Sequence, residues 1–294
     1  TILGTTNRCS PFAWCEGPGV TRDRGDEVIA RARALGIDLL INVGGDGSQA
    51  ISLELSRRGL PVIGVPKTID NDLDATVETF GFGTAVQVVT DALDRLRTTA
   101  ESHDRTMILE VMGRHAGWIA LHSGIAGGAD VALIPELPYR PEIVARDLRR
   151  SLGEGRHFAL VVVAEGAAPV GGEVSTRTVS AGRHGSASVL GGAGQRVAEE
   201  LAALMPDLEL RVTVLGHIQR GGTPTAYDRL LASRLGVEAV EAALRGEQNV
   251  LVSSQPPNIT TVPLELAVQK MRAVDPNGQL VAHARGLGIS FGDA

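Results

Sequence analysis

The chain has 294 residues, a formal net charge of −6 and a hydrophobic content of 43%. Such a chain can bury a substantial core in one large or two medium domains, which argues against disorder. Its negative charge repels nucleic acid and anionic lipid, so an anionic substrate must be bound by a local basic cluster. We therefore expect a soluble protein that binds neither nucleic acid nor membranes.

The cysteines and the hydropathy indicate the cellular compartment. Only Cys9 and Cys15 occur, too few for a disulfide framework in a chain of this length. We expect two structural thiols in a reducing cytoplasm, with a metal or redox pair as the alternative. No apolar stretch approaches the ~20 residues that span a bilayer, so no transmembrane segment is expected.

Short β-branched segments alternate with segments of helical periodicity along the chain. This rhythm is typical of βαβ units with parallel sheets, and it predicts an α/β fold. The expected strands span residues 38–43, 61–65, 106–111, 130–134, 158–164 and 210–215. The expected helices span residues 22–35, 48–58, 84–103, 114–126, 141–153, 194–204, 226–245 and 263–272. The segment from Ala167 to Gly192 has neither periodicity and is expected to be an exposed loop.

A glycine-rich turn, residues 44–48, directly follows the first apolar strand, which is expected to be buried. Glycines let backbone N–H groups approach a phosphate, and the following helix offers its positive end. Asp46 stands at the carboxyl end of the strand and is a candidate Mg²⁺ ligand, because Mg²⁺ takes one or two carboxylates plus substrate oxygens. The alternative is a plain tight turn with Ser48 as a helix N-cap.

Residues 66–72, Pro-Lys-Thr-Ile-Asp-Asn-Asp, follow the second apolar strand. An alcohol that attacks phosphorus must lose its proton, and Asp70 is the candidate base. Thr68 can donate to the transferring group, Asp72 can bind metal or orient Asp70, and Lys67 can neutralise phosphate charge. The alternative is a solvated acidic turn.

Three potential cations, Arg211, His217 and Arg220, lie on and just after one strand of an acidic protein. Forked guanidinium groups suit a phosphate dianion, and the histidine adds a donor. The alternatives are surface salt bridges and a structural histidine.

These motifs, together with residues 81–85, 112–117, 134–136, 165–166 and 215–222, occur in the order found in the phosphofructokinase family, which the chain resembles over nearly its whole length. The resemblance implies two Rossmann-like three-layer domains with mostly parallel sheets. Residues 1–82 plus 219–272 would bind the phosphoryl donor and Mg²⁺, and residues 83–218 plus 273–294 would bind fructose 6-phosphate. It also implies an upstream strand and phosphate loop, so we expect residues 1–294 alone to be weakly active or inactive.

The resemblance assigns roles to these residues. Asp70 would accept the proton, Asp46 would bind Mg²⁺, Thr68 and Asp72 would support catalysis, and Arg114 would stabilise charge on the moving phosphoryl group. The sugar phosphate would be bound by Arg105, Met112, Gly113, Glu165, Arg211, His217 and Arg220. Because Arg105 and Arg211 reach in from a neighbouring subunit in the family, a homo-oligomer, either a dimer or a tetramer, is expected.

The phosphoryl donor is expected to be ATP, with pyrophosphate as the alternative. Gly47 leaves room for the α-phosphate of a nucleotide, where an aspartate would repel it, whereas Lys67 is typical of pyrophosphate users. The Gly47 and Lys67 combination resembles an actinobacterial branch of mixed type. Other donor-binding candidates are Gly45, Ser48, Arg22 and Arg24.

Two other functions remain open. A noncatalytic sugar-phosphate-sensing subunit would keep the fold, but such proteins tend to lose the base and the metal ligand, and both Asp70 and Asp46 are present. A lipid or NAD kinase shares the glycine turn but gives no reason for the motif at residues 217–220. We therefore expect an enzyme, a 6-phosphofructokinase.

Overall fold

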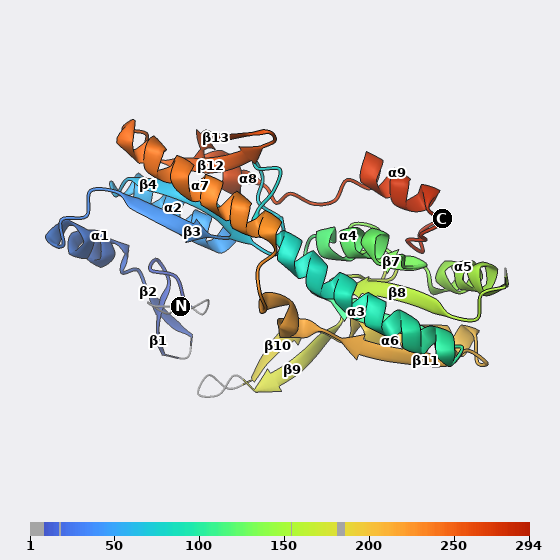
Figure 1. Ribbon diagram of the computed structural model, residues 1–294. Helices are drawn as coiled ribbons and strands as arrows, with labels where there is room; N and C mark the ends of the chain where they lie inside the picture. The colour runs from blue at the N-terminus through green and yellow to red at the C-terminus, as the bar shows by residue number, and fades with distance from the viewer. Residues whose placement is uncertain (1–8, 18, 154, 181–185) are drawn as a thin grey trace. The chain divides into compact units, whose positions relative to one another are not determined.

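The computed structural model describes residues 9–17, 19–153, 155–180 and 186–294, and the chain divides into two compact units (Figure 1). Unit 1 comprises residues 1–68, 73–80 and 229–271. Unit 2 comprises residues 69–72, 81–228 and 272–294. The α/β class with mostly parallel sheets is confirmed. The short segment Ile69–Asp72, which carries Asp70, belongs to unit 2, although the strand that precedes it belongs to unit 1.

Unit 1 is built on a sheet in which β12, β4 and β3 are parallel and β13 is antiparallel. Its elements are α1 (Gly25–Ala34), β3 (Leu40–Gly44), α2 (Asp46–Arg57), β4 (Val62–Thr68), β12 (Val250–Gln255), β13 (Asn258–Pro263) and α8 (Leu264–Gln269). Two further elements belong partly to each unit, β5 (Phe80–Gly81) and α7 (Ala226–Leu244). Val62 packs with α1, α2 and α8, whereas Ile63 and Val65 pack with α7. Successive side chains of β4 thus point to helices on opposite faces of the sheet, and unit 1 has three layers, with the sheet between two layers of helices.

Strand β3 differs from the buried strand that was expected. It is the last strand in the described order of its sheet, and the side chains of Ile41 and Val43 are 37% and 52% exposed. An apolar run identifies a strand but does not say whether that strand is central or at an edge.

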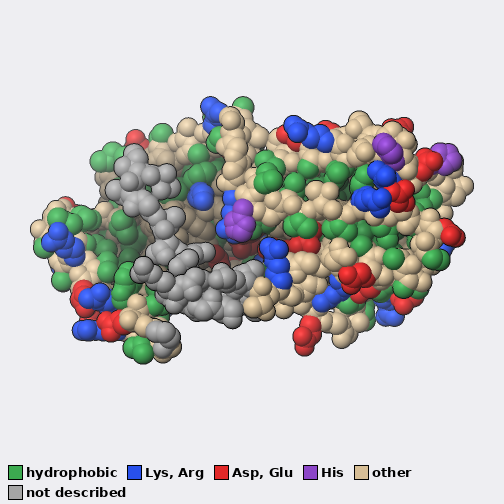
Figure 2. All heavy atoms as spheres, turned by 90° about the horizontal axis from the view of Figure 1, so that it is seen from below, with side chains coloured by type: hydrophobic (Ala, Val, Ile, Leu, Met, Phe, Trp, Pro, Cys, Tyr) green, Lys and Arg blue, Asp and Glu red, His purple; other side chains and the backbone are tan. Residues whose placement is uncertain are grey.

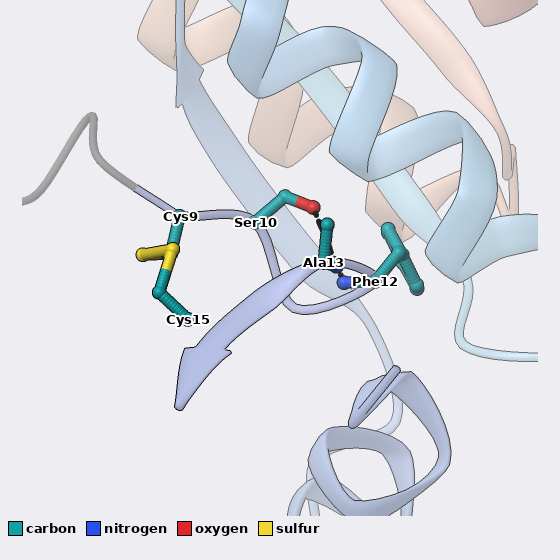
Figure 3. The surroundings of a disulfide bond; sticks show 5 residues. All are labelled: Cys9, Ser10, Phe12, Ala13 and Cys15. Carbon is teal, nitrogen blue, oxygen red and sulfur yellow. Dashed lines mark hydrogen bonds between the residues drawn. A yellow bond between two sulfur atoms is a disulfide. The ribbon is translucent and has the colours of Figure 1, made fainter. Parts of the chain in front are cut away.

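The first described residues of unit 1 form a small hairpin of β1 (Trp14–Gly17) and β2 (Val20–Arg22). The turn before it folds back through a bridge between Ser10 and Ala13, which brings the Cα atoms of Cys9 and Cys15 within 5.9 Å (Figure 3). The two cysteines are joined in a disulfide. The expectation of free structural thiols was therefore wrong, because this turn places the two side chains within bonding reach.

Unit 2 contains a four-stranded parallel sheet in the order β11, β6, β8, β7. Its main elements are α3 (Phe82–Ser102), β6 (Thr106–Val111), α4 (Trp118–Ala126), β7 (Val131–Leu133), α5 (Pro141–Gly153), β8 (Ala159–Ala164), β9 (Thr176–Ser180), β10 (Ser186–Leu190), α6 (Ala193–Leu204), β11 (Leu210–Val214), the 3-10 helix η2 (Gly216–Arg220) and α9 (Gln279–Gly286). One face of the sheet packs with α3, α4 and α9, and the other packs with α5 and α6. The unit is thus a second three-layer α/β structure.

Several elements differ from the sequence predictions. The segment expected to be an exposed loop contains the antiparallel hairpin β9–β10, whose β-branched Thr and Val residues favour strands. Helix α4 begins at Trp118, so Arg114 lies in the preceding loop and not at a helix start. The pair β12–β13 and helix α9 were not predicted.

The described part of the chain contains no helix that is both long and apolar enough to cross a bilayer. Basic and acidic side chains are interspersed on the face shown in Figure 2.

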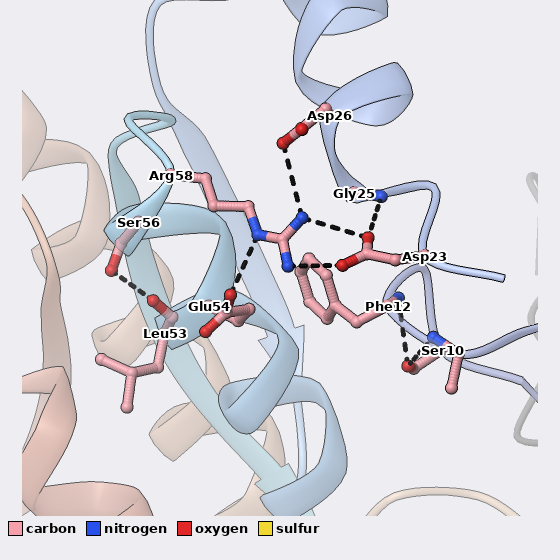
Figure 4. Close-up of polar contacts among 10 residues, drawn as sticks. Ser10, Phe12, Asp23, Gly25, Asp26, Leu53, Glu54, Ser56 and Arg58 are labelled. Atoms are coloured by element: carbon pink, nitrogen blue, oxygen red, sulfur yellow. Dashed lines mark hydrogen bonds and ion pairs between the residues drawn. The ribbon is translucent and has the colours of Figure 1, made fainter.

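Arg58 holds the N-terminal part of unit 1 against α2 (Figure 4). Its guanidinium donates to Asp23 at 2.7 and 3.0 Å and to Glu54 at 2.9 Å, and it lies 4.6 Å from the centre of the Phe12 ring. The hydrogen bond from Arg58, followed by one from the Gly25 N–H, lowers the pKa of Asp23 below its ordinary value of 3.8. Such a carboxyl stabilises the fold above its unfolded pKa, and this contribution is lost as the pH falls through the folded pKa.

We predict that Arg58→Met lowers the melting temperature at neutral pH, because Asp23 then loses its main partner. For the same reason, the melting temperature of the variant should decrease less than that of wild type when the pH is lowered below about 4. Thermal unfolding of the full-length protein from pH 7 to pH 2 measures this effect. Arg57→Met is the matched control, since Arg57 forms one exposed pair with Glu265 at 3.2 Å. Equal acid sensitivity in wild type and Arg58→Met would contradict the assignment.

Candidate functional site

In unit 1, polar residues gather where β3 and β4 end. The strands are parallel and Gly44 is opposite Pro66, so the glycine turn and the Lys67–Thr68 pair leave the sheet at the same edge. A Cβ on Gly45 would lie 3.2 Å from the Thr68 Cβ, tighter than ordinary packing, so glycine lets the turn pass close to Thr68.

Buried Gln49 fixes this arrangement. Its amide donates to the carbonyl oxygens of Gly44 at 3.0 Å and of Val65 at 3.2 Å, and so ties α2 to both strands. The N-terminal end of α2 is therefore held at the edge from which Asp46 and Lys67 project, both of them exposed.

The chemistry of the glycine turn suits phosphate and Mg²⁺. Apart from its chain neighbours and the backbone of its own helix, no described heavy atom lies within 4 Å of the position that a Cβ would take on Gly47, so the space beside it is open. Within the described ranges there is no cluster of three His, Cys, Asp or Glu side chains that could hold a metal by itself. Mg²⁺ does not need one, because a single carboxylate such as Asp46 plus phosphate oxygens suffices.

The other predicted donor-binding residues of unit 1 lie as follows. Ser48 is in the first turn of α2, and its carbonyl accepts from Asn42 and Ser52. Arg22 and Arg24 both lie near Glu27, at 3.9 and 3.1 Å.

Unit 2 contains a cavity of about 660 Å³. Six predicted site residues line it: Asp70, Met112, Arg114, Glu165, His217 and Arg220. They come from four separate chain segments, and the predicted residue Gly113 stands between two of them in the sequence. We call this space the unit 2 cavity. Asp72 lies two residues after Asp70, and its carbonyl accepts from the Arg272 N–H at 2.8 Å.

Two glycines bring the Arg114 loop against the Glu165 loop. The Gly166 N–H donates to the Gly113 carbonyl at 3.1 Å, and a Cβ on Gly166 would lie only 2.1 Å from the Arg114 carbonyl oxygen. Gly113 has φ +143°, a conformation that favours glycine. Any side chain at position 166 would push the two loops, and with them Arg114 and Glu165, apart.

Glu136 fixes the far end of the Arg114 loop. Its carboxylate accepts from the Gly117 N–H at 2.9 and 3.1 Å, just before α4, and from the Val274 N–H at 2.8 Å. The loop of residues 113–117 is thus held at both ends.

Acidic and basic groups share the unit 2 cavity. Burial, followed by the charges of Asp70 and Glu110, raises the pKa of Glu165, and Arg220 and Arg114 oppose this shift. Among the described residues, neither Arg114 nor Arg220 forms an ion pair with a carboxylate. These guanidinium groups are therefore available to an anionic ligand.

Sequence reasoning assigned no role to two buried residues, one that lines this cavity and one that binds a lining residue. Glu110, 3% exposed, accepts from the Gly192 N–H at 3.2 Å and the Gly194 N–H at 2.8 Å, where α6 begins. Gln219, 1% exposed, accepts from the Met112 N–H at 2.8 Å. A glutamate inside an apolar strand was a signal for the first residue, because buried carboxylates are rare without partners.

Arg105 and Arg211 lie outside the unit 2 cavity. Both donate to the same oxygen of Glu209, Arg105 at 2.7 Å. Arg105 precedes β6 and Arg211 is near the start of β11, whereas the cavity lies beyond the ends of these strands. The chain's own copies of the two arginines are thus separated from His217 and Arg220.

Both units are three-layer α/β structures, and in both of them polar residues gather at the carboxyl ends of parallel strands. This arrangement is typical of α/β proteins that bind ligands at that edge of the sheet. The model of the family described as "Phosphofructokinase" matches residues 1–243. The chain is 54% identical to an ATP-dependent 6-phosphofructokinase of Chloroflexus aurantiacus, over all of this chain and 80% of the relative. The chain belongs to the phosphofructokinase family.

Some of the other relatives are named as ATP-dependent enzymes, and one is named as a pyrophosphate-dependent enzyme. An ATP-dependent 6-phosphofructokinase 1 of Synechocystis is 47% identical over all of this chain and 80% of its own length. A pyrophosphate–fructose 6-phosphate 1-phosphotransferase of Amycolatopsis methanolica is 48% identical over 94% of this chain and 78% of its own length. Among solved structures, the phosphofructokinase of Saccharomyces cerevisiae is similar with a TM-score of 0.69 at 32% identity, covering 84% of this chain and 34% of that one.

We predict that Glu110→Ala destabilises the protein by about 2 kcal/mol, because it leaves two buried N–H groups without their acceptor. Glu110→Gln keeps one carbonyl acceptor and should lose less. Urea unfolding with an unchanged slope measures both changes. Glu199→Gln, which alters an exposed residue of α6, is the control. Equal midpoints for all variants would contradict the role of Glu110 in capping the start of α6.

Proposed function

We propose that the protein containing this chain transfers a phosphoryl group from ATP to the 1-hydroxyl of fructose 6-phosphate. The observation that carries the proposal is the unit 2 cavity, where one carboxylate suited to act as base, Asp70, lies with the cations Arg114, His217 and Arg220. Membership of the phosphofructokinase family supplies the reaction class. The ATP-dependent names of the relatives at 47% and 54% identity support ATP as the donor.

The unit 2 cavity would bind the sugar phosphate. His217 and Arg220 follow β11 and would bind the phosphate, since a guanidinium binds a phosphate through paired charge-assisted hydrogen bonds. Glu165 and the loop of Met112 and Gly113 would contact the sugar. A carboxylate at Glu165 accepts from sugar hydroxyl groups, which gives selectivity for a polyol over a simple phosphate.

Transfer forms a bond between the sugar O1 and phosphorus and breaks the bond between phosphorus and the bridging oxygen of the donor. Asp70 accepts the hydroxyl proton as this happens, with Asp72 and Thr68 as supporting groups. Arg114 donates to the oxygens of the moving phosphoryl group, where negative charge develops. The bridging oxygen keeps the electron pair of the broken bond, and the leaving group is ADP.

Unit 1 would bind the donor. Gly45, Gly47 and Ser48 offer backbone N–H groups at the start of α2, which is the positive end of the helix. Asp46 would hold Mg²⁺, which neutralises phosphate charge when bound. Lys67 adds an exposed ammonium at the same edge, and Arg22 and Arg24 are further donor-binding candidates.

A pyrophosphate-dependent enzyme is the second candidate. Lys67 and the 48% identity to the Amycolatopsis enzyme favour it. The open space beside Gly47 favours ATP, because an added nucleoside needs room that pyrophosphate does not. We give this steric argument the greater weight. A noncatalytic sugar-phosphate-sensing subunit is the third candidate, and the presence of Asp46 and Asp70 argues against it.

We further propose a cytoplasmic homo-oligomer, a dimer or a tetramer. In the family, Arg105 and Arg211 complete the sugar-phosphate site of a neighbouring subunit, and in this chain both lie away from their own unit 2 cavity. Two copies related by a symmetry axis would supply these residues to each other.

We predict that Asp70→Asn in the full-length protein lowers kcat by about 10³-fold with little change in the KM for fructose 6-phosphate, because the base is lost and the phosphate ligands remain. A coupled assay measures both constants. Asp74→Asn removes a carboxylate four residues further along the chain, which pairs with Lys270 at 3.5 Å, and it serves as the control. A kcat within tenfold of wild type would contradict the role of Asp70.

We predict that wild type uses ATP, and that Gly47→Asp raises the KM for ATP at least about tenfold, because the new carboxylate repels the α-phosphate. Ala34→Asp adds the same charge at an exposed position at the end of α1, away from the glycine turn in the sequence, and should leave this KM nearly unchanged. Turnover of wild type with pyrophosphate and none with ATP would overturn the donor assignment.

A further inference from the structure

The hairpin β9–β10 and the residues beside it form one wall of the unit 2 cavity. Val174, Thr176, Arg177, Val189, Leu190 and Gly191 line this wall. Val174 and Val189 remain 42% and 36% exposed there. No role in catalysis or binding was expected for this segment, because its sequence has no marked periodicity.

The base of the hairpin is held firmly to the rest of unit 2. The Gly191 N–H donates to the Ser175 carbonyl at 3.2 Å, Arg196 donates to the Glu173 carbonyl, and the Gly192 N–H donates to Glu110. Position 177 pairs with Val189, one step from the first pair of the ladder at Thr176 and Leu190. Arg177 thus stands at the anchored end of the hairpin.

The Arg177 side chain lies across a glycine. The position that a Cβ would take on Gly191 is 3.1 Å from the Arg177 Nε atom, so a larger residue at 191 would press on the guanidinium. Arg177 and Val189 are opposite each other, which puts them on the same face of the hairpin, and both line the cavity. Thr178, the next residue of β9, does not line the cavity.

Arg177 also changes the charge of the cavity. With Arg114, His217 and Arg220 it makes four potential cations in the lining, against Asp70, Glu110 and Glu165. Among the described residues, no side chain forms an ion pair or hydrogen bond with the Arg177 guanidinium. An exposed arginine that lines a cavity together with two other arginines, and that has no side-chain partner among the described residues, is suited to an anionic ligand.

We propose that Arg177 is a further substrate-binding residue, which binds the phosphate of the sugar phosphate together with His217 and Arg220. This inference rests on the proposed function. Arg105 and Arg211 are bonded to Glu209 and do not line the unit 2 cavity of their own chain. Arg177 therefore supplies this cavity with a cation from the same chain. The hairpin is thereby part of the acceptor site.

The test compares Arg177→Thr, Arg177→Lys and the exchange Arg177→Thr with Thr178→Arg in the full-length protein. The exchange keeps the composition but moves the guanidinium to position 178, which does not line the cavity. Arg177→Thr and the exchange should each raise the KM for fructose 6-phosphate about tenfold, with kcat and the KM for ATP within about twofold of wild type. Arg177→Lys should lie between them and wild type, since it keeps the charge but loses the forked geometry.

Calorimetric binding of fructose 6-phosphate without donor gives a second readout, in which the dissociation constant should rise by the same factor. An inactive wild type that still binds the sugar phosphate through Arg177 would refute the proposed reaction but not the binding role. An unchanged sugar-phosphate constant in Arg177→Thr, an exchange variant that behaves as wild type, or an effect confined to ATP would overturn the assignment of Arg177.

Discussion

The parallel register of β6, β8 and β11 is the constraint on which the proposed acceptor site depends. Val111, Ala164 and Val214, the last residues of these strands, lie at nearly the same level, since Val111 pairs with Ala164 and Val214 pairs with Glu110. The loops that follow therefore leave one edge together. Strands β6 and β8 are buried along their whole length, so most of the polar side chains of the site lie at or beyond the ends of the strands.

In the unit 2 cavity, close backbone contacts position the loops, and charged side chains on those loops are available to bind a ligand. Gly113 and Gly166 let two loops touch, and Glu136 and Glu110 accept N–H groups where α4 and α6 begin. These contacts fix the side chains that reach the cavity. Arg114, Arg177 and Arg220 can then act on an anion in a protein whose overall charge is negative, because their effect is local.

Much of this arrangement could be predicted from the sequence, because long apolar periodicity specifies α3 and the β-branched runs specify the parallel strands. The motifs around Asp46, Asp70 and His217 could be placed at strand ends for the same reason. The hairpin β9–β10 could not, since alternating Ser, Thr and Val residues carry a weak pattern, and Arg177 was missed with it. The pairing of Cys9 with Cys15 and the edge position of β3 depend on tertiary packing, which a local pattern does not encode.

The most direct test of the account is a crystal structure of the full-length protein with fructose 1,6-bisphosphate, which presents both phosphates of the acceptor product. We predict that the product occupies the unit 2 cavity, with its 6-phosphate bound by His217, Arg220 and Arg177 and its 1-phosphate oxygen beside Asp70. Product bound at another place, with these four side chains exposed to solvent, would contradict the account.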